Sequence, residues 1–86
     1  MEERIKMTHE EVLNIVRGIF RDVFDDDDLI VEDSTNSSDI EDWDSLEHIA
    51  LVVSMEKEFD LKFDLKEVNK LENVGQMVDL IISKLA

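Results

Sequence analysis

The residue of this sequence that is best suited to chemistry is Ser45, which follows a long acidic segment and precedes an apolar one. Asp44 and Glu47 have the spacing of a capping box, so we predict that Asp44 is the N-cap of a helix and Ser45 its first residue. A helix start carries unpaired N–H groups and the positive end of the helix dipole, both of which stabilise a phosphate. The pattern therefore predicts a serine hydroxyl that is placed to hold a phosphodiester.

A second chemistry for the same serine is nucleophilic catalysis with His48, three residues further along the helix. A working pair also needs a group that orients the base, an oxyanion site and a cleft that excludes water, and a chain of 86 residues with two histidines offers few of these. We therefore expect no catalytic residue. His48 is expected to be a partly exposed helix residue, and His9 a surface residue near the start of the first helix.

Metal binding is not predicted either. The chain has no cysteine, and its two histidines do not form a His-x-x-x-His pattern. The four aspartates at 25–28 lack the glycine and the alternating spacing of a calcium loop. We expect a solvated acidic loop there, with loose attraction of divalent cations from charge density alone.

The elements that must position Ser45 are helices. The sequence has no proline, no tyrosine and two glycines, which disfavours a turn-rich β fold. Apolar residues recur at helical spacing in four segments, at about 8–24, at 45–59, in a short stretch after Asp64, and from 73 to about 85. We predict an all-α fold, a small four-helix bundle with three long helices and one short one.

A long loop is predicted between the first two helices. Residues 25–42 contain nine acids, no base and no clean helical period. Leu29, Ile30, Val31 and Ile40 are expected to pin this loop to the core, and residues 37–40 are compatible with a short turn of helix.

The second helix has an unusually broad apolar face, an arc of about 220° where a surface helix has a stripe of roughly 100°. Central burial explains most of this width, and the rest is available to a ligand or a visiting protein. We expect the apolar residues of this helix to divide into two groups. One group fills the core, namely Leu51, Val52, Met55 and Phe59, and the other stays exposed near the serine, namely Leu46 and Val53.

Length and charge set the broad class of the protein. Its 86 residues suit one domain over 1–86, with 1–7 as a flexible lead-in. The formal net charge of -14 opposes binding to nucleic acid or to anionic membranes and favours a soluble monomer whose partners carry basic patches. We see no signal peptide and no run long enough for stable membrane insertion, so we expect a cytoplasmic protein.

Asp44-Ser45-Leu46 resembles the attachment motif of the acyl carrier protein family, and residues 52–59 resemble the apolar pair, acidic cluster and closing phenylalanine of its second helix. The resemblance covers about residues 8–85, including the order of the helices. It implies that a phosphopantetheinyl transferase moves 4′-phosphopantetheine from coenzyme A to Ser45, between Asp44 and Leu46. The arm would then carry acyl groups as thioesters, and the protein would be a carrier and not an enzyme.

The same resemblance implies a docking surface on the second helix for acyl-transferring and chain-modifying enzymes. By position, Asp44, Glu47, Val53 and Glu56 match this surface. Ala50 and Lys57 replace acids that are usual in general fatty-acid carriers, and Trp43 replaces a small residue. The pathway therefore stays open between fatty-acid synthesis and a specialised lipid, polyketide or surface-glycan route.

Two alternatives remain at this point. An aminoacyl or peptidyl carrier usually has a glycine-rich approach to the serine, where this chain has Glu41-Asp42-Trp43-Asp44. A helical interaction module without an arm would use the same broad apolar face to bind a partner. Coexpression with a transferase separates the classes, because only a carrier gains mass.

Overall fold

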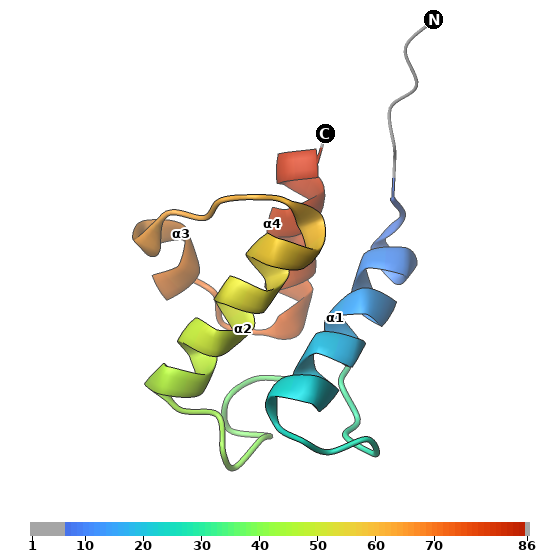
Figure 1. Ribbon diagram of the computed structural model, residues 1–86, viewed down its shortest axis with the longest axis vertical. Helices are drawn as coiled ribbons and strands as arrows, with labels where there is room; N and C mark the ends of the chain where they lie inside the picture. Colours follow the sequence, from blue (N-terminus) through green and yellow to red (C-terminus); the bar gives the residue numbers. More distant parts are fainter. Residues whose placement is uncertain (1–6, 86) are drawn as a thin grey trace, which may run out of the picture.

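The computed structural model describes residues 7–85, and in that range it contains four α-helices and no strand (Figure 1). They are α1 (His9–Val23), α2 (Ser45–Phe59), α3 (Leu65–Asn69) and α4 (Val74–Leu85). The predicted fold class of three long helices, one short helix and a long loop is confirmed. Residues 1–6 of the expected lead-in lie outside the described range, whereas Met7 is half-buried and packs against the core. None of the described helices has the length and apolar character that a bilayer crossing requires.

The helix ends follow from local hydrogen bonds. At α1, Thr8 and Glu11 form a reciprocal capping box: the Thr8 hydroxyl accepts from the Glu11 N–H at 3.1 Å, and the Glu11 carboxylate accepts from the Thr8 N–H at 2.9 Å. At α4, the Asn73 side chain accepts from the Gln76 N–H at 2.9 Å, but the Gln76 side chain accepts from the Glu72 N–H instead of the Asn73 N–H. Asn73 and Gln76 have the spacing of a capping box, and only one of its two hydrogen bonds is formed.

The core lies where α1 packs against both α4 and α2. Its buried residues are Val12, Leu13, Val16, Ile19 and Phe20 from α1, Leu51, Met55 and Phe59 from α2, and Val74, Met77, Val78 and Ile81 from α4. Each such side chain contributes about 1.5–3 kcal/mol when it leaves water. For α2, the predicted burial of Leu51, Met55 and Phe59 is confirmed, whereas Val52 is only half-buried.

The loop between α1 and α2 passes along this core. Val31 and Ile40 are buried and Leu29 is half-buried, as predicted, but Ile30 is 75% exposed. The prediction for Ile30 was wrong because it points away from the core that its neighbour Val31 enters. No helix forms over 37–40, where the Asp39 N–H donates to the Asn36 carbonyl at 2.9 Å and closes a turn.

Two arginines of α1 hold the first half of the loop. Arg17 Nε donates to the Val31 carbonyl at 2.8 Å, and Arg21 Nε donates to the Leu29 carbonyl at 3.0 Å. A charged donor makes these bonds stronger than ordinary amide bonds. The loop is therefore attached to α1 through its backbone, and Arg17 also lies 3.4 Å from the exposed Glu32 carboxylate.

The start of α4 holds the next part of the loop. The N–H groups of Val74 and Gly75 donate to the carbonyls of Thr35 and Asp33 at 2.9 and 2.8 Å. Helix starts carry N–H groups without intrahelical partners, and the loop satisfies two of them here. A Cβ on Gly75 would lie 3.2 Å from the Asp33 carbonyl oxygen, so glycine permits this close approach.

His9 joins three elements, which the sequence did not indicate. Its Nε2 lies 2.7 Å from Asp33 Oδ1 in the loop, and its Nδ1 lies 3.5 Å from Asp79 Oδ1 in α4. The hydrogen bond with Asp33, assisted by the charges of both carboxylates, raises the pKa of His9 above its ordinary value. The ring remains at the surface, as predicted.

The short helix α3 has fewer buried residues than the three long helices. Val68 is buried, but Leu65, which fits the helical spacing of this short segment, is 79% exposed. Glu67 accepts from the Asp64 N–H at 3.0 Å and lies 3.1 Å from Lys84 Nζ of α4. The backbone hydrogen bond and then the ammonium hold the pKa of Glu67 below its usual range.

Candidate functional site

Ser45 is the first residue of α2 and is exposed. Asp44 is the N-cap, and its Oδ1 accepts from the Glu47 N–H at 2.9 Å. The Asp44 N–H donates to the Asp42 carbonyl at 3.0 Å instead of to the Glu47 side chain, so the predicted capping box is half formed. The serine hydroxyl thus lies at the positive end of α2, where a phosphate on its oxygen would be stabilised.

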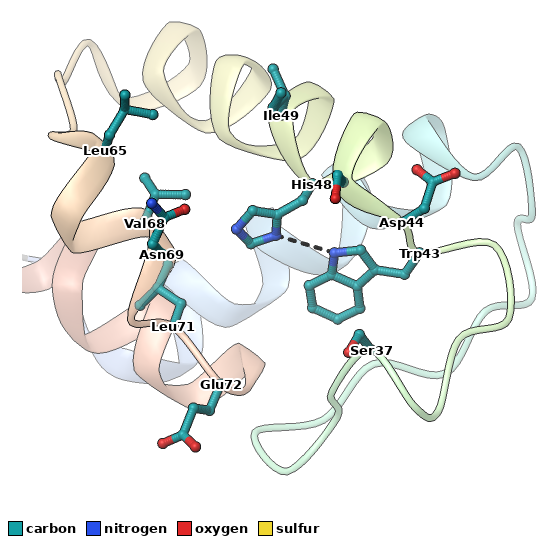
Figure 2. A pocket seen from close by; sticks show the side chains of 11 residues that line it. Ser37, Trp43, Asp44, His48, Ile49, Leu65, Val68, Asn69, Leu71 and Glu72 are labelled. Carbon is teal, nitrogen blue, oxygen red and sulfur yellow. Dashed lines mark hydrogen bonds between the residues drawn. The ribbon is translucent and has the colours of Figure 1, made fainter.

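A cavity of about 440 Å³ opens beside Ser45, between α2, α3 and the loop (Figure 2). Its α2 wall includes Ser45, His48 and Ile49, and its α3 wall includes Val68 and Asn69. Ser37 and Trp43 contribute from the loop side. The walls mix apolar carbons with hydrogen-bonding groups, so the cavity suits a ligand that has both.

Trp43 and His48 form a pair at the centre of this cavity wall. The indole Nε1 donates to His48 Nδ1 at 3.2 Å, and the two rings lie nearly parallel, with centroids 5.9 Å apart and an interplanar angle of 21°. Trp43 also packs edge-on against the buried Phe20, with centroids 5.2 Å apart and an angle of 84°. The indole therefore connects the site to the core.

The Trp43–His48 pair argues against the hypothesis that Ser45 and His48 act as a nucleophile and its base. His48 is half-buried, as predicted, but the acceptor nitrogen of its ring is occupied by Trp43. Within residues 7–85, the hydrogen bonds include none between Ser45 and His48.

A second hollow, of about 410 Å³, adjoins Asp44 on the acidic surface. Carboxylates of Glu41, Asp42, Asp44 and Glu47 line it together with Val23 and Phe24. A surface of this charge attracts lysine and arginine side chains of other proteins. In the described part of the chain, no group of three or more histidine or acidic side chains is arranged to hold a metal ion.

An apolar strip of α2 remains uncovered. Leu46, Ile49 and Val53 are 71%, 58% and 42% exposed. The sequence predicted this exposure for Leu46 and Val53, since the apolar arc is wider than one packing interface. The strip begins next to Ser45 and runs along the helix for two turns.

Glu56 has a structural contact that the sequence did not indicate. Its Oε2 accepts from the Phe63 N–H at 2.8 Å, across the turn between α2 and α3. Asp60 makes this turn in the left-handed conformation, with φ 54°. Glu56 is half-buried, so only part of its carboxylate is available to a partner.

Sequence reasoning also missed the Trp43–His48 contact, although a signal existed. Trp43 precedes the N-cap and His48 is the fourth helical residue, which are the two positions of a hydrophobic staple. The α3 wall had no such signal, because Val68 and Asn69 reach the cavity only through the turn that follows α2.

Comparison with known proteins identifies a matching family and several similar proteins. A family model described as phosphopantetheine attachment site matches residues 14–81, most of the chain. An acyl carrier protein of Thermosynechococcus vestitus is 30% identical over 81 residues, which cover 93% of this chain and 99% of that protein. One from Petrotoga mobilis is 32% identical over 80 residues, covering 92% and 93% of the two chains.

A solved structure is also similar. The solution structure of a holo acyl carrier protein from Geobacter metallireducens aligns with a TM-score of 0.81 and 46% sequence identity. The alignment covers 86% of this chain and 85% of that one.

Proposed function

The chain belongs to the acyl carrier protein family, and we propose that Ser45 is the residue to which its arm is attached. As a member, the chain is a carrier and not an enzyme, and its cofactor is covalently attached 4′-phosphopantetheine. The observation that supports Ser45 is its exposed hydroxyl at the first position of α2, inside the matched residues 14–81.

The attachment reaction uses few groups of this chain. In the transfer from coenzyme A, a bond forms between Ser45 Oγ and the phosphorus next to the pantetheine. The phosphoanhydride bond breaks, 3′,5′-ADP leaves, and the serine proton passes to a base of the transferase. Asp44 is held in the N-cap by the Glu47 N–H, so its part is to fix the helix start and present the hydroxyl.

The residues around Ser45 fit such a group. The helix start stabilises the phosphate, and the adjoining cavity offers apolar walls at Ile49 and Val68 and polar ones at His48 and Asn69. When bound, the arm supplies a terminal thiol that holds an acyl group as a thioester, and the chain itself has no cysteine.

Docking of partner enzymes is proposed for the acidic and apolar surface beside Ser45. Asp44 and Glu47 belong to the acidic hollow, and Leu46 and Val53 to the exposed strip. Charge complementarity speeds encounter with basic enzymes and still allows release after each step. Glu56 should contribute less than its position suggests, because it accepts a hydrogen bond from Phe63.

For the pathway, we propose fatty-acid synthesis or a specialised lipid, polyketide or surface-glycan route, with acyl intermediates as cargo. The shared name of the relatives supports an acyl cargo. Release of the bound acyl groups from protein purified with its native partners, followed by mass spectrometry, distinguishes common fatty acyl chains from specialised ones.

The test of the attachment site is intact-protein mass after incubation with coenzyme A and a broad-specificity phosphopantetheinyl transferase. We expect one phosphopantetheine on the wild type and none on Ser45→Ala. Ser37→Ala is the matched control, because Ser37 lines the same cavity from the loop, and this variant should be loaded normally. Loading of Ser45→Ala would contradict the assignment of the site. A folded wild type that gains no mass would favour the interaction-module alternative.

A further inference from the structure

We propose that His48 is a positioning residue for the arm: its Nε2–H donates a hydrogen bond to an acceptor oxygen of the chain attached to Ser45. This inference rests on the proposed attachment at Ser45 and adds a contact that holds the arm along the cavity between α2 and α3.

The first step is the tautomer of His48. Tryptophan Nε1 can only donate, so His48 Nδ1, which lies 3.2 Å away, must be the acceptor. A neutral imidazole carries one proton, and with Nδ1 as acceptor this proton is on Nε2. The neutral ring is therefore a hydrogen-bond donor on its other side.

The second step is the direction of that donor. Figure 2 shows the imidazole extending from α2 into the space between α2 and α3, with the nitrogen bonded to Trp43 on one side and the other nitrogen turned toward α3. His48 and Asn69 both line this cavity. Across residues 7–85, the side-chain hydrogen bonds include none from His48 Nε2.

The third step is rigidity. The His48 ring is hydrogen-bonded to Trp43 and nearly parallel to it, and Trp43 packs edge-on against Phe20, which is fully buried. The donor is thus oriented by the core before any ligand arrives. A preorganised donor loses little conformational entropy when it binds, so one hydrogen bond can shift the arm toward a single path.

The fourth step is what the donor can meet. Ser45 and His48 are three residues apart on one helix and both line the cavity, so a chain that leaves Ser45 through the cavity passes the imidazole. The arm has a hydroxyl and two amide carbonyls that can accept a hydrogen bond. An acyl cargo with an oxygen on its third carbon would offer the same chemistry, and the experiment must separate the two sources.

The experiment is ¹⁵N NMR of the His48 ring at a pH where the ring is neutral, in the apo protein, the holo protein, and holo protein loaded with a saturated or a 3-hydroxyacyl chain. Intact mass first establishes that the arm is on Ser45. We expect the Nε2–H tautomer in the apo protein. In the holo or acyl-loaded protein, the Nε2 chemical shift should change and the Nε2 proton should exchange with solvent more slowly. A change with the arm alone identifies an arm oxygen, and one that appears only with the 3-hydroxyacyl chain identifies the cargo.

Two variants separate positioning from packing. Trp43→Phe keeps an aromatic ring but removes the indole N–H, so His48 should populate both tautomers and lose most of its response to loading. His48→Gln keeps a donor and His48→Phe does not. The amide nitrogens of the attached arm are labelled with ¹⁵N in each variant. Their chemical shifts should be near the wild-type values in His48→Gln and should move toward those of free phosphopantetheine in His48→Phe.

The contrary outcomes are distinct. If no arm is found on Ser45, the attachment proposal fails and this inference fails with it. If the arm is attached but Nε2 does not respond in any loaded form, only this inference is overturned. If Nε2 responds to the arm alone, equal arm shifts in folded His48→Gln and His48→Phe would also overturn the inference, because the donor would then make no difference to the arm.

Discussion

The two sides of this bundle are held together by different means. On the α1–α4 side, apolar side chains such as Val16 and Ile81 are fully buried, and hydrogen bonds from Arg17 and from the start of α4 tie the loop down. On the α2–α3 side, apolar residues remain exposed and a cavity lies between the helices. Buried apolar area stabilises a fold, whereas open apolar area is available for binding. The first side therefore contributes buried area to the core, to which one face of α2 also belongs, and the second side leaves apolar surface open, where we propose ligand and partner contacts.

A pair of side-chain truncations, one on each side, tests this difference in stability most directly. Ile81→Ala removes a fully buried side chain of α4 and should lower the free energy of unfolding by about 2–5 kcal/mol. Leu65→Ala removes an exposed side chain of α3 and should change it by less than about 0.5 kcal/mol. Urea denaturation followed by circular dichroism measures both. Similar losses in the two variants would show that stability is shared evenly between the sides.

A smaller effect is expected from charge reversal on the two sides. Glu47→Lys places a positive charge in the acidic hollow beside Ser45, and we expect kcat/KM for phosphopantetheinyl transfer to fall on the order of tenfold at low salt. Asp22→Lys makes the same charge change on α1 and serves as the control, with little expected effect. Initial rates at several salt concentrations measure both. An equal fall in the two variants would point to net charge alone and not to a docking surface.

The smallest effect concerns the pH dependence of the α1–α4 side. Because Asp33 raises the pKa of His9, the contribution of this contact is fully present below the unfolded pKa of about 6.5. It is lost as pH rises through the higher pKa of the folded state. The difference in melting temperature between wild type and His9→Gln should therefore shrink from mildly acidic to alkaline pH. A difference that is constant with pH would contradict this role for the contact with Asp33 and Asp79.

Much of the fold was predictable because its signals are local. Thr8 with Glu11 and Asp44 with Glu47 act within one helical turn, so the starts of α1 and α2 follow from neighbours in the sequence. The exposure of Leu46 followed from an apolar arc too wide for one interface. The position of Ser45 as the first residue of α2 followed from the same local signal.

The sequence was insufficient where position along the chain does not determine direction in space. Ile30 and Val31 are equally apolar neighbours, and only the packing of the loop decides that Val31 is buried. Leu65 fits the helical period of α3, but a helix of five residues cannot cover its whole apolar side. The docking role of Glu56 stays a prediction, and its hydrogen bond with Phe63 could not be predicted because it depends on how the chain turns after α2.

The sequence by itself determined the helices, their starts and the serine at the head of α2, because capping and helical periodicity operate over three or four residues. Only the tertiary structure decided which surface stays open. Contacts between distant residues, such as Arg17 with Val31 and His9 with Asp33, hold the loop on one side. The cavity forms on the other side, because α3 does not pack closely enough to fill the space beside Ser45 and His48.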